Sequence, residues 1–362
     1  MHFENSLKFF LVSFEPYAER YFAQKLKSQK KYPLLIYQFY KDLFDFTVGG
    51  KKLRAFLVYL GYRLGKVTKR QRDKVGEGIK EILPIALAYE LAHSFLLIHD
   101  DIIDQSATRR GRLTIHKRYE KLFGSSASLR ARDHYGVSQA IILGDIACFE
   151  AFNLVCDSDF SESQKVLCQK KLITTLLETG YGEALDVEYS YKEATFEAIW
   201  QMMQAKTAKY SFVGPLTLGA VLAGADKSQI NALAKFGLLV GTAFQLQDDF
   251  LGVFGNEKIL GKSILSDMRE GKNTILIYKT REIITSQDKR ELERLWAKKD
   301  AKMADLKKIR QIIISSGAFD WNQAQKRKLV GEAKVHIQKI TKEPSLRQIL
   351  SQLADFVIER ES

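Results

Sequence analysis

The chain has 362 residues, a formal net charge of +13 at pH 7, and hydrophobic residues at 46% of its positions. It has only five prolines and no Pro/Gly/Ser-rich linker or low-complexity run, so we expect one large domain over residues 1–362, built from long helices. The three cysteines show no CxxC spacing, which argues against a disulfide framework and a zinc site and favours a reducing compartment.

The positive charge fits nucleic acid, anionic lipid or a small anionic ligand, and by itself it does not decide between them. Much of the excess is lysine in scattered pairs such as Lys30–Lys31 and Lys170–Lys171. These pairs lack the interleaved aromatic side chains of single-strand-binding surfaces. We therefore expect no nucleic-acid partner.

Two apolar stretches need to be separated from export signals and membrane spans. The cluster from Phe9 to Phe14 is flanked by charged residues and is too short for the core of a signal peptide. The longest apolar stretch, from Ile82 to Ile98, carries Glu90 and His93, so it is interpreted as a buried core helix. We expect a cytoplasmic protein without a transmembrane segment.

Helical spacing of apolar residues recurs along most of the chain, while strand-like alternation is nearly absent. Turn signals at 49–50, 157–159 and 223–226 separate the predicted helices. The fold class is therefore predicted to be all-α. The stretch 255–271 is predicted to be a long loop with several lysines, and loops of that length in compact domains are often lids or binding loops.

The first group of residues suited to binding or catalysis is the set of acids around Asp100. Asp100 and Asp104 are four residues apart and share a helix face, whereas Asp101 is rotated by about 100 degrees and supports them. Carboxylates on one helix face are suited to magnesium, which takes oxygen ligands and is usually completed by water and substrate phosphate. Apolar neighbours such as Ile98 and Ile102 argue against a merely exposed acidic turn, because burial of several carboxylates is costly without a cation.

Basic residues lie on both sides of these acids in the sequence. Upstream is the run Gly49–Arg54, and downstream is the run Arg109–Arg112. Arginine pairs bidentately with phosphate oxygens, and Gly49 and Gly50 allow the backbone and Lys51 to approach a ligand closely. Each run alone fits a solvated surface, but next to an acidic metal site the two runs indicate a polyanionic ligand.

A second acidic pair, Asp248 and Asp249, lies inside the apolar segment that follows Gln245. The segment is similar to the one around Asp100, and two such helices facing each other would form one site with two walls. Lys206 and Thr207, and then Lys262 and Lys272, add the cationic and hydroxyl donors that a second phosphate group needs.

In this order and spacing the motifs resemble those of the trans-isoprenyl diphosphate synthases, also called polyprenyl synthetases. The resemblance covers residues 49–272. It rests on Gly-Gly-Lys-x-x-Arg at 49–54, His93, DDIID followed by RRG at 100–111, GEALD at 182–186, Lys206–Thr207, and QLQDD followed by Lys262.

The resemblance implies an isoprenoid synthase-type bundle of antiparallel helices around a deep central cavity, usually as a homodimer. It implies condensation of an allylic diphosphate with isopentenyl diphosphate, with three magnesium ions as cofactor. Arg109 and Lys206 join the aspartates as the catalytic group. By position, the resemblance implies that magnesium is bound by Asp100, Asp104 and Asp248, with Asp101 and Asp249 in support. Isopentenyl diphosphate is held by Lys51, Arg54, His93 and Arg110. The allylic diphosphate is held or polarised by Arg109, Lys206, Thr207, Gln245 and Lys262.

Product length is expected to depend on Phe95, five residues before Asp100, and on Leu96 beside it. At 1.5 Å per residue Phe95 lies roughly 7 to 8 Å below the metal site, where its ring forms the floor of the pocket. The alternative is that Phe95 only packs in the core. A single aromatic residue here is similar to the pattern of geranylgeranyl diphosphate synthases, so we predict a twenty-carbon product, with the fifteen-carbon farnesyl product as the alternative.

Three positions depart from the family pattern: Gly252 stands where many members have a third Asp, and Ala55 and Leu113 replace common prolines. Gly252 is interpreted as a variant within active enzymes. A class I terpene cyclase is disfavoured by the second diphosphate pocket around Arg54 and His93, and a non-catalytic synthase subunit is disfavoured by the two intact Asp pairs. His99 and His116 are left outside the site, because a histidine near a metal cluster is as often structural.

Overall fold

The computed structural model describes residues 2–67, 78–124, 128–257 and 263–360. Most of these residues are helical, which confirms the all-α prediction. The described strands, β1 (Thr108–Arg109) and β2 (Arg112–Leu113), form one antiparallel hairpin in which Thr108 pairs with Leu113. The chain folds as two compact units, which are described separately because each has its own core. The expectation of a single domain stays a prediction.

Unit 1 contains residues 1–172 and 215–226. Its elements are α1 (Phe3–Gln29), α2 (Leu34–Val48), α3 (Leu53–Val67), α4 (Ile79–Ile103), the hairpin, α5 (Ile115–Leu122), α6 (Leu129–Cys156), the first part of α7 (Glu162–Tyr189), and α9 (Gly214–Leu222) from Pro215 onward.

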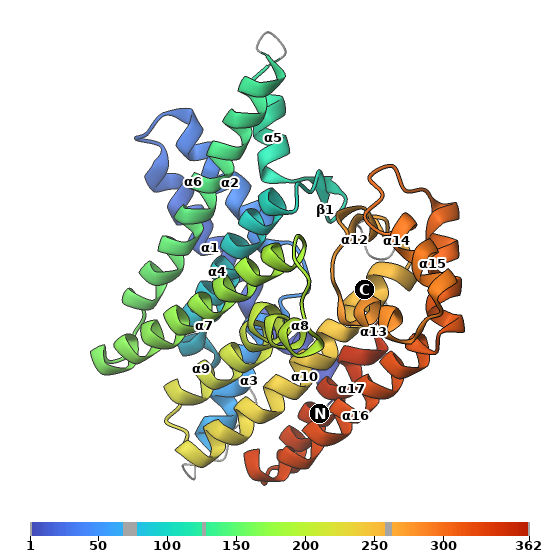
Figure 1. Ribbon diagram of the computed structural model, residues 1–362. Coiled ribbons are helices and arrows are strands. Elements are labelled where there is room, and N and C mark those ends of the chain that lie inside the picture. The colour runs from blue at the N-terminus through green and yellow to red at the C-terminus, as the bar shows by residue number, and fades with distance from the viewer. Residues whose placement is uncertain (1, 68–77, 125–127, 258–262, 361–362) are drawn as a thin grey trace. The chain divides into compact units, whose positions relative to one another are not determined.

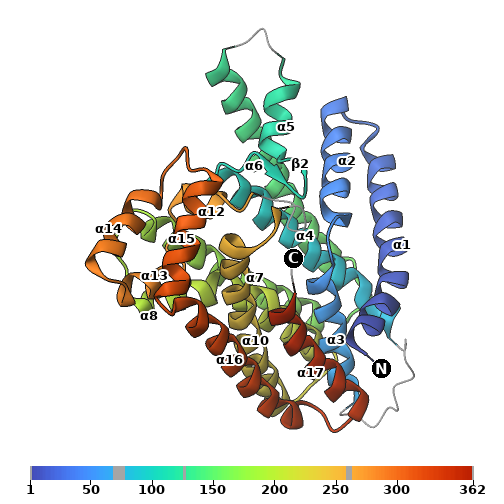
Figure 2. The ribbon, with the colours of Figure 1, turned by 90° about the vertical axis from the view of Figure 1, so that its right-hand side faces the viewer.

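Helix α4 is the centre of unit 1. It packs against α6 and α3 (Figure 1), and most of its side chains are buried. As expected from the apolar stretch 82–98, it is a core helix. Helices α1 and α2 lie side by side (Figure 2), and α1 contributes Phe10, which stacks on Phe14 at 5.1 Å and on Tyr59 of α3 at 5.3 Å.

Helix α9 contacts α3 backbone to backbone. A Cβ on Gly61 would lie 2.1 Å from the carbonyl oxygen of Leu216, and one on Gly219 would lie 2.0 Å from that of Val58. Real Cβ atoms do not come this close to a carbonyl oxygen, so glycine is required at both positions for the helices to pack at this distance.

Unit 2 contains residues 173–214 and 227–362. Its elements are the rest of α7, α8 (Phe196–Met203), the π-helix η1 (Gln204–Val213), α10 (Lys227–Phe254), α12 (Ser266–Glu270), α13 (Ile275–Ile283), α14 (Ser286–Leu295), α15 (Met303–Ser315), α16 (Ala318–Ile340) and α17 (Pro344–Glu359).

Helix α10 is the centre of unit 2 and packs against α16 and η1. Gly237 and Gly241 let α10 approach η1 closely, since a Cβ on Gly241 would lie 2.7 Å from the Cα of Ala208. The helices from α12 to α15 surround a second apolar cluster that includes Met268 and Trp296.

The stretch 255–271, predicted to be a loop, differs in its second half. Residues 266–270 form α12, and Met268 is buried because Ile264, Leu265 and Met268 reach the apolar cluster together. Residues 258–262, which include Lys262, lie outside the described residues, so the expected position of Lys262 is not tested.

Helices α4 and α6 are both long and apolar enough to cross a membrane by composition alone. In α4, 72% of the most apolar window is buried inside the protein, and in α6 only 44% is. Core helices of soluble proteins pass the same test, so these two helices are weak evidence for a span. The exposed apolar face of α6 needs a separate explanation.

Candidate active site

The first acidic group lies at the end of α4 in unit 1. The helix ends at Ile103 with Asp104 as its C-cap, and Asp100 and Asp104 are one turn apart with partly exposed side chains. Arg109, on the hairpin, donates from Nε to Asp101 Oδ1 at 2.8 Å and from an amino group to Asp100 Oδ2 at 2.9 Å. The fork therefore fixes the two adjacent carboxylates, Asp100 and Asp101.

Asp101 is the buried member of this group, at 1% exposure. Burial raises its pKa to about 6, although the Arg109 guanidinium acts in the opposite direction. Its Oδ2 atom is buried without a hydrogen-bond partner in the part of the chain that the structure describes. These observations fit the supporting role predicted for Asp101, beneath carboxylates that face the solvent.

The basic groups of unit 1 gather around His93 on α4. Arg54 donates to Nε2 of His93 at 3.2 Å. Because arginine has no acceptor, Nε2 must accept and the ring proton lies on Nδ1. Burial lowers the pKa of His93 well below its ordinary value, and Arg54, Arg110, Arg109 and Lys52 lower it further. His93 is therefore neutral at pH 7.

The two adjacent lysines of the glycine-rich element have different roles. Lys51, the predicted ligand residue, is exposed. Lys52 is buried with φ of 53°, and its Nζ donates to the carbonyl of Gly49 at 2.5 Å. It also lies 3.9 Å from Glu90 Oε2. Lys52 thus holds the turn in place and leaves Lys51 at the surface.

The two glycines of this turn lie against Arg110. A Cβ on Gly50 would lie 2.7 Å from an amino nitrogen of Arg110, and one on Gly49 would lie 3.0 Å from the other. Gly50 also has φ of 91°, which favours glycine. The Arg110 guanidinium therefore lies against the glycine turn, and the structure brings Arg54, His93 and Arg110 together in unit 1.

Lys206, in unit 2, lies on the π-helix η1 and pairs with two acids of α7. Its Nζ is 2.9 Å from Glu183 Oε2 and 2.6 Å from Asp186 Oδ2. Gly182 makes this possible, since a Cβ there would lie 2.3 Å from the backbone nitrogen of Lys206. Wide turns of this kind often occur at functional sites. Thr207, the next residue, is half-buried.

The second Asp pair lies on α10 of unit 2. Gln245 donates from Nε2 to Asp249 Oδ1 at 2.7 Å, which fixes the buried member. Burial raises the pKa of Asp249 to about 7, and Asp267, Asp248 and Asp186 raise it further. Asp248 is partly exposed and forms an ion pair with Arg360, whose guanidinium also lies 3.7 Å from the centre of the Phe244 ring. Each Asp pair thus has one buried and one accessible carboxylate.

Phe95 and Leu96 are both half-buried on α4. The Phe95 ring contacts His99 at 4.8 Å between centroids. His99 packs against Gly144 of α6, and its Nε2 lies 3.2 Å from the carbonyl of Ile141. His99 is thus part of the packing of α4 against α6. His116 is also buried, and burial lowers its pKa.

The acidic side chains suit magnesium only as part of a shell that water and phosphate complete. Among the described residues no three His, Cys, Asp or Glu side chains are gathered closely enough to hold a metal ion alone. Asp100 and Asp104 in unit 1 and Asp248 in unit 2 nevertheless have partly exposed carboxylates, and Asp101 in unit 1 has a buried Oδ2. These residues fit an ion that takes most of its ligands from water and phosphate.

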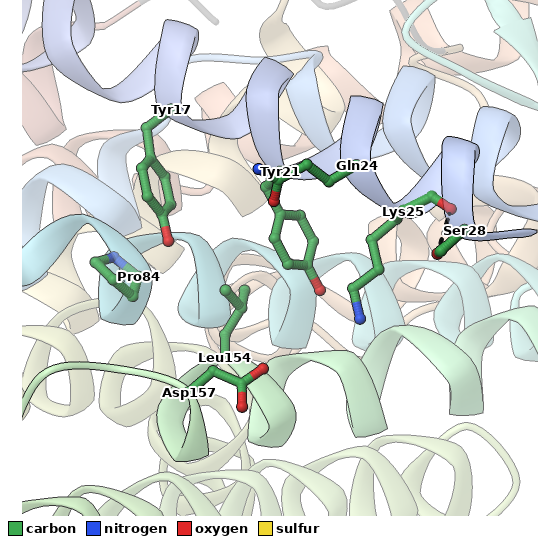
Figure 3. Close-up of a pocket in the computed structure, with 8 residues that line it drawn as sticks. All are labelled: Tyr17, Tyr21, Gln24, Lys25, Ser28, Pro84, Leu154 and Asp157. Atoms are coloured by element: carbon green, nitrogen blue, oxygen red, sulfur yellow. Dashed lines mark hydrogen bonds between the residues drawn. The ribbon is translucent and has the colours of Figure 1, made fainter.

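A hollow of about 390 Å³ lies elsewhere in unit 1 (Figure 3). Tyr17 and Tyr21 of α1 line it opposite Pro84 of α4, and Lys25 lies at one end. None of the residues predicted from the sequence lines it. Tyr21 and Lys25 both bond to Glu150 of α6, at 2.8 and 2.6 Å, so these polar groups are used in packing α1 on α6.

Sequence reasoning missed several residues of these clusters. Glu90 is a buried carboxylate that accepts from the backbone nitrogen of Ala55 at 3.1 Å and balances the cations near it. Asp186 and Arg360 were not predicted as partners of Lys206 and Asp248. The GEALD motif was a usable signal for Asp186, whereas nothing in the sequence near Arg360 indicated its contact with α10.

Comparisons with known proteins agree with this arrangement. The polyprenyl synthetase profile matches residues 35–313. The geranylgeranyl diphosphate synthase of Saccharolobus solfataricus is 32% identical over 273 residues, covering 74% of each chain. The geranylfarnesyl diphosphate synthase of Aeropyrum pernix is 30% identical over 325 residues, covering 86% of this chain and 91% of that one. The crystal structure of geranylgeranyl pyrophosphate synthase from Corynebacterium glutamicum, complexed with isoprenyl diphosphate and magnesium, has a TM-score of 0.86 at 28% identity and covers 97% of this chain and 99% of its own.

Proposed function

Because the chain belongs to the polyprenyl synthetase family, we propose that it joins an allylic diphosphate to isopentenyl diphosphate with magnesium and releases mainly geranylgeranyl diphosphate. That the chain is a trans-prenyltransferase follows from its family and relatives. The observation that best supports the proposal is the repeated arrangement of the Asp pairs, each with one carboxylate buried and its partner accessible.

Asp100, Asp104 and Asp248 would hold the ions, three in number, with Asp101 and Asp249 fixed behind them. When bound, magnesium would neutralise charge that develops on the departing diphosphate. Arg109 and Lys206, with Thr207, Gln245 and Lys262, would hold the allylic diphosphate while its C–O bond breaks. The bond electrons leave with the diphosphate, and the isopentenyl double bond then attacks the allylic carbon. The released diphosphate takes up the proton that is lost.

Isopentenyl diphosphate would bind at Arg54, His93 and Arg110, with Lys51 at the rim. A neutral His93 contributes a hydrogen bond from Nδ1 without adding charge, and the guanidinium groups pair with phosphate oxygens. The buried Glu90 keeps the cations together when no anion is bound.

The geranylgeranyl product is proposed because a single aromatic residue, Phe95, lies one and a half turns before Asp100. Relatives named for geranylgeranyl and for geranylfarnesyl products have similar identity to this chain, so family membership alone does not choose. The farnesyl product is the second candidate, since Phe95 and Leu96 are both large and half-buried.

The chain is proposed to act as a homodimer through α6. Ile142 and Phe149 are seven residues apart on one face of α6 and are 47% and 71% exposed. Ile141 and Leu129 on the same helix are also exposed. An apolar face of this kind indicates a protein interface. The resemblance to a family of homodimers makes a second copy of this chain the proposed partner. We further propose a cytoplasmic location and a single functional domain.

One assay tests the proposal. The purified protein is incubated with labelled isopentenyl diphosphate and with dimethylallyl, geranyl or farnesyl diphosphate in turn, with and without magnesium, and the products are sized. Twenty-carbon product that disappears in a chelator is the expected result. Turnover at a normal rate in the chelator would contradict the magnesium dependence, and fifteen-carbon product alone would contradict the proposed length.

A further inference from the structure

One end of unit 1 presents large apolar side chains to the solvent. Leu34, the first residue of α2, is 79% exposed, and Tyr32 and Leu35 near it are exposed as well. At the end of α5, Leu122 is 61% exposed and Phe123 is 43% exposed. None of these five residues belongs to α6, through which the dimer is proposed to form.

The two groups lie at the same end because α2 and α5 run in opposite directions. Arg110, before α5, donates to the carbonyl of Phe46 near the end of α2 at 3.4 Å. Further along α5, the ring of Tyr119 contacts that of Phe39, earlier on α2, at 5.5 Å between centroids. One more turn of each helix leads to the exposed apolar residues. Figure 2 shows the start of α2 and the end of α5 at one end of unit 1.

Lysines surround these apolar side chains. Residues 24–41 contain five lysines and neither Asp nor Glu. The exposed lysines at this end are Lys27, Lys30 and Lys31 at the turn between α1 and α2, and Lys121 on α5. Among the described residues none of these four lysines forms an ion pair. Glu120, the acid next to Lys121, is paired with Lys117 at 2.7 Å.

We propose that this end of unit 1 docks on a lipid bilayer that contains anionic headgroups. The lysines would pair with headgroup phosphates, while Leu34, Leu122 and Tyr32 enter the boundary between headgroups and acyl chains. Each lysine close to such a surface strengthens binding about fivefold. The inference goes beyond the proposed function, and none of these residues belongs to the candidate active site.

The kind of apolar side chain favours lipid over nucleic acid. Single-stranded nucleic acid is bound by cations interleaved with aromatic rings on which bases stack, whereas the most exposed apolar residues here are the leucines Leu34 and Leu122. Leucine has no flat face for a base, but it enters an acyl layer readily. A bilayer also fits the proposed product, because a long prenyl chain with a diphosphate is itself an anionic lipid.

The test measures vesicle binding without substrate. Purified protein is sedimented with vesicles of phosphatidylcholine alone and of phosphatidylcholine mixed with phosphatidylglycerol, at low and at high salt. Wild type should bind the mixed vesicles only, and high salt should weaken the binding because it screens exposed charges.

Two variants remove the two parts of the surface. Lys30→Glu/Lys31→Glu should lower the partition coefficient by about 25-fold or more, because two attractive charges become repulsive. Leu34→Asp should lower it by roughly tenfold through loss of an inserted side chain. Aspartate is favourable in the first turn of a helix, so α2 should be retained.

Two matched controls lie on α16 of unit 2. Arg327→Glu/Lys328→Glu makes the same change in net charge at another exposed basic pair, and Val335→Asp places an acid at a side chain that is 71% exposed. Both controls should bind vesicles like wild type. All four variants should keep the wild-type turnover when vesicles are absent, which shows that they are folded.

Several results would overturn the proposal. Wild type that stays in solution with the mixed vesicles would do so, and so would an equal loss of binding in the controls. If wild type binds a labelled single-stranded oligonucleotide and not the vesicles, the surface serves nucleic acid. If Lys30→Glu/Lys31→Glu lowers the mass found by light scattering, the surface is an interface between copies. Because no substrate is present, each result is independent of the proposed prenyl transfer.

Discussion

His93 is neutral and buried, yet it lies among the cations of the basic cluster in unit 1. Its Nε2 accepts from Arg54, and Glu90, one turn earlier on α4, carries the compensating negative charge. A histidine in this position has a direct consequence for stability, because protonation would add a further positive charge to a desolvated group of cations.

The first prediction concerns the pH dependence of folding. The folded-state pKa of His93 is lowered below 6.5, so at lower pH the unfolded chain binds a proton that the folded chain does not. Folding stability from His93 is therefore fully present above pH 6.5. It is lost as pH falls, by up to about 1.4 kcal/mol per pH unit until the folded-state pKa is reached.

The measurement is urea unfolding of wild type and His93→Gln at pH 8, 6 and 5. The advantage of wild type over the variant should shrink as pH falls below 6.5. The pKa of Asp101 is raised to about 6, so Asp101 titrates in the same range. It does so in wild type and in the variant alike, and its contribution cancels in the difference between their unfolding free energies. A difference that is constant with pH would contradict the neutral state of His93.

Phe95 is the residue on which the product length depends. Phe95→Ala should shift the products to longer chains, because removal of the ring opens the floor of the pocket. Product sizing with farnesyl diphosphate as primer measures the change, and Val335→Ala, on the exposed surface of α16, is the control. If Phe95→Ala leaves the product distribution unchanged, Phe95 is a packing residue of α4 and the floor is formed elsewhere.

At the scale of elements, η1 depends on close contact with its neighbours. Gly182 of α7 and Gly241 of α10 both meet the η1 backbone, at Lys206 and at Ala208. The contact with α7 also brings Glu183 and Asp186 to Lys206. The position of the Lys206 amino group is therefore set by a glycine on another helix.

Gly182→Ala tests this arrangement. Its Cβ would lie 2.3 Å from the Lys206 nitrogen, so α7 and η1 must separate, which should cost about 1–3 kcal/mol of unfolding free energy and much of the turnover. Gly180→Ala is the matched control, since a Cβ there meets nothing within 4 Å. The control should be neutral or stabilising by up to about 1 kcal/mol, because alanine favours the helix. Equal effects of the two changes on urea unfolding would count against the close contact.

Elements were predicted from sequence where one physical signal dominated. Apolar spacing was sufficient for α4 and α10, because long periodic segments leave little ambiguity. It did not find η1, since a wider turn results from packing between helices and not from local preference. Nor did the sequence indicate that Lys52 is buried with a positive φ while Lys51 beside it is exposed, because no periodic pattern records a backbone dihedral angle.

Some contacts of the candidate site join residues that are near each other in sequence, such as Arg109 with Asp100 and Gln245 with Asp249. Contacts that bring distant positions together, such as Asp248 with Arg360 and Gly252 with Asp267, require the tertiary fold.

At the scale of the whole molecule, the exposed face of α6 predicts the assembly state. Phe149→Asp places a charge in the proposed interface, so light scattering after size exclusion should show a shift from dimer to monomer. Val335→Asp is the matched control, because Val335 on α16 is also 71% exposed. A dimer that persists in Phe149→Asp, or a wild-type monomer, would contradict the role of α6.

The backbone contact of α9 with α3 has a consequence for synthesis on the ribosome. Unit 1 is made of residues 1–172 and 215–226. After residue 172 has been synthesised, about 50 further residues must be added before Gly219 can pack against the face of α3 around Gly61. At about 5–20 residues per second this delay lasts for several seconds. During that interval the face of α3 around Gly61 lacks the helix that covers it, and slow translation of the residues that precede α9 would prolong this exposure.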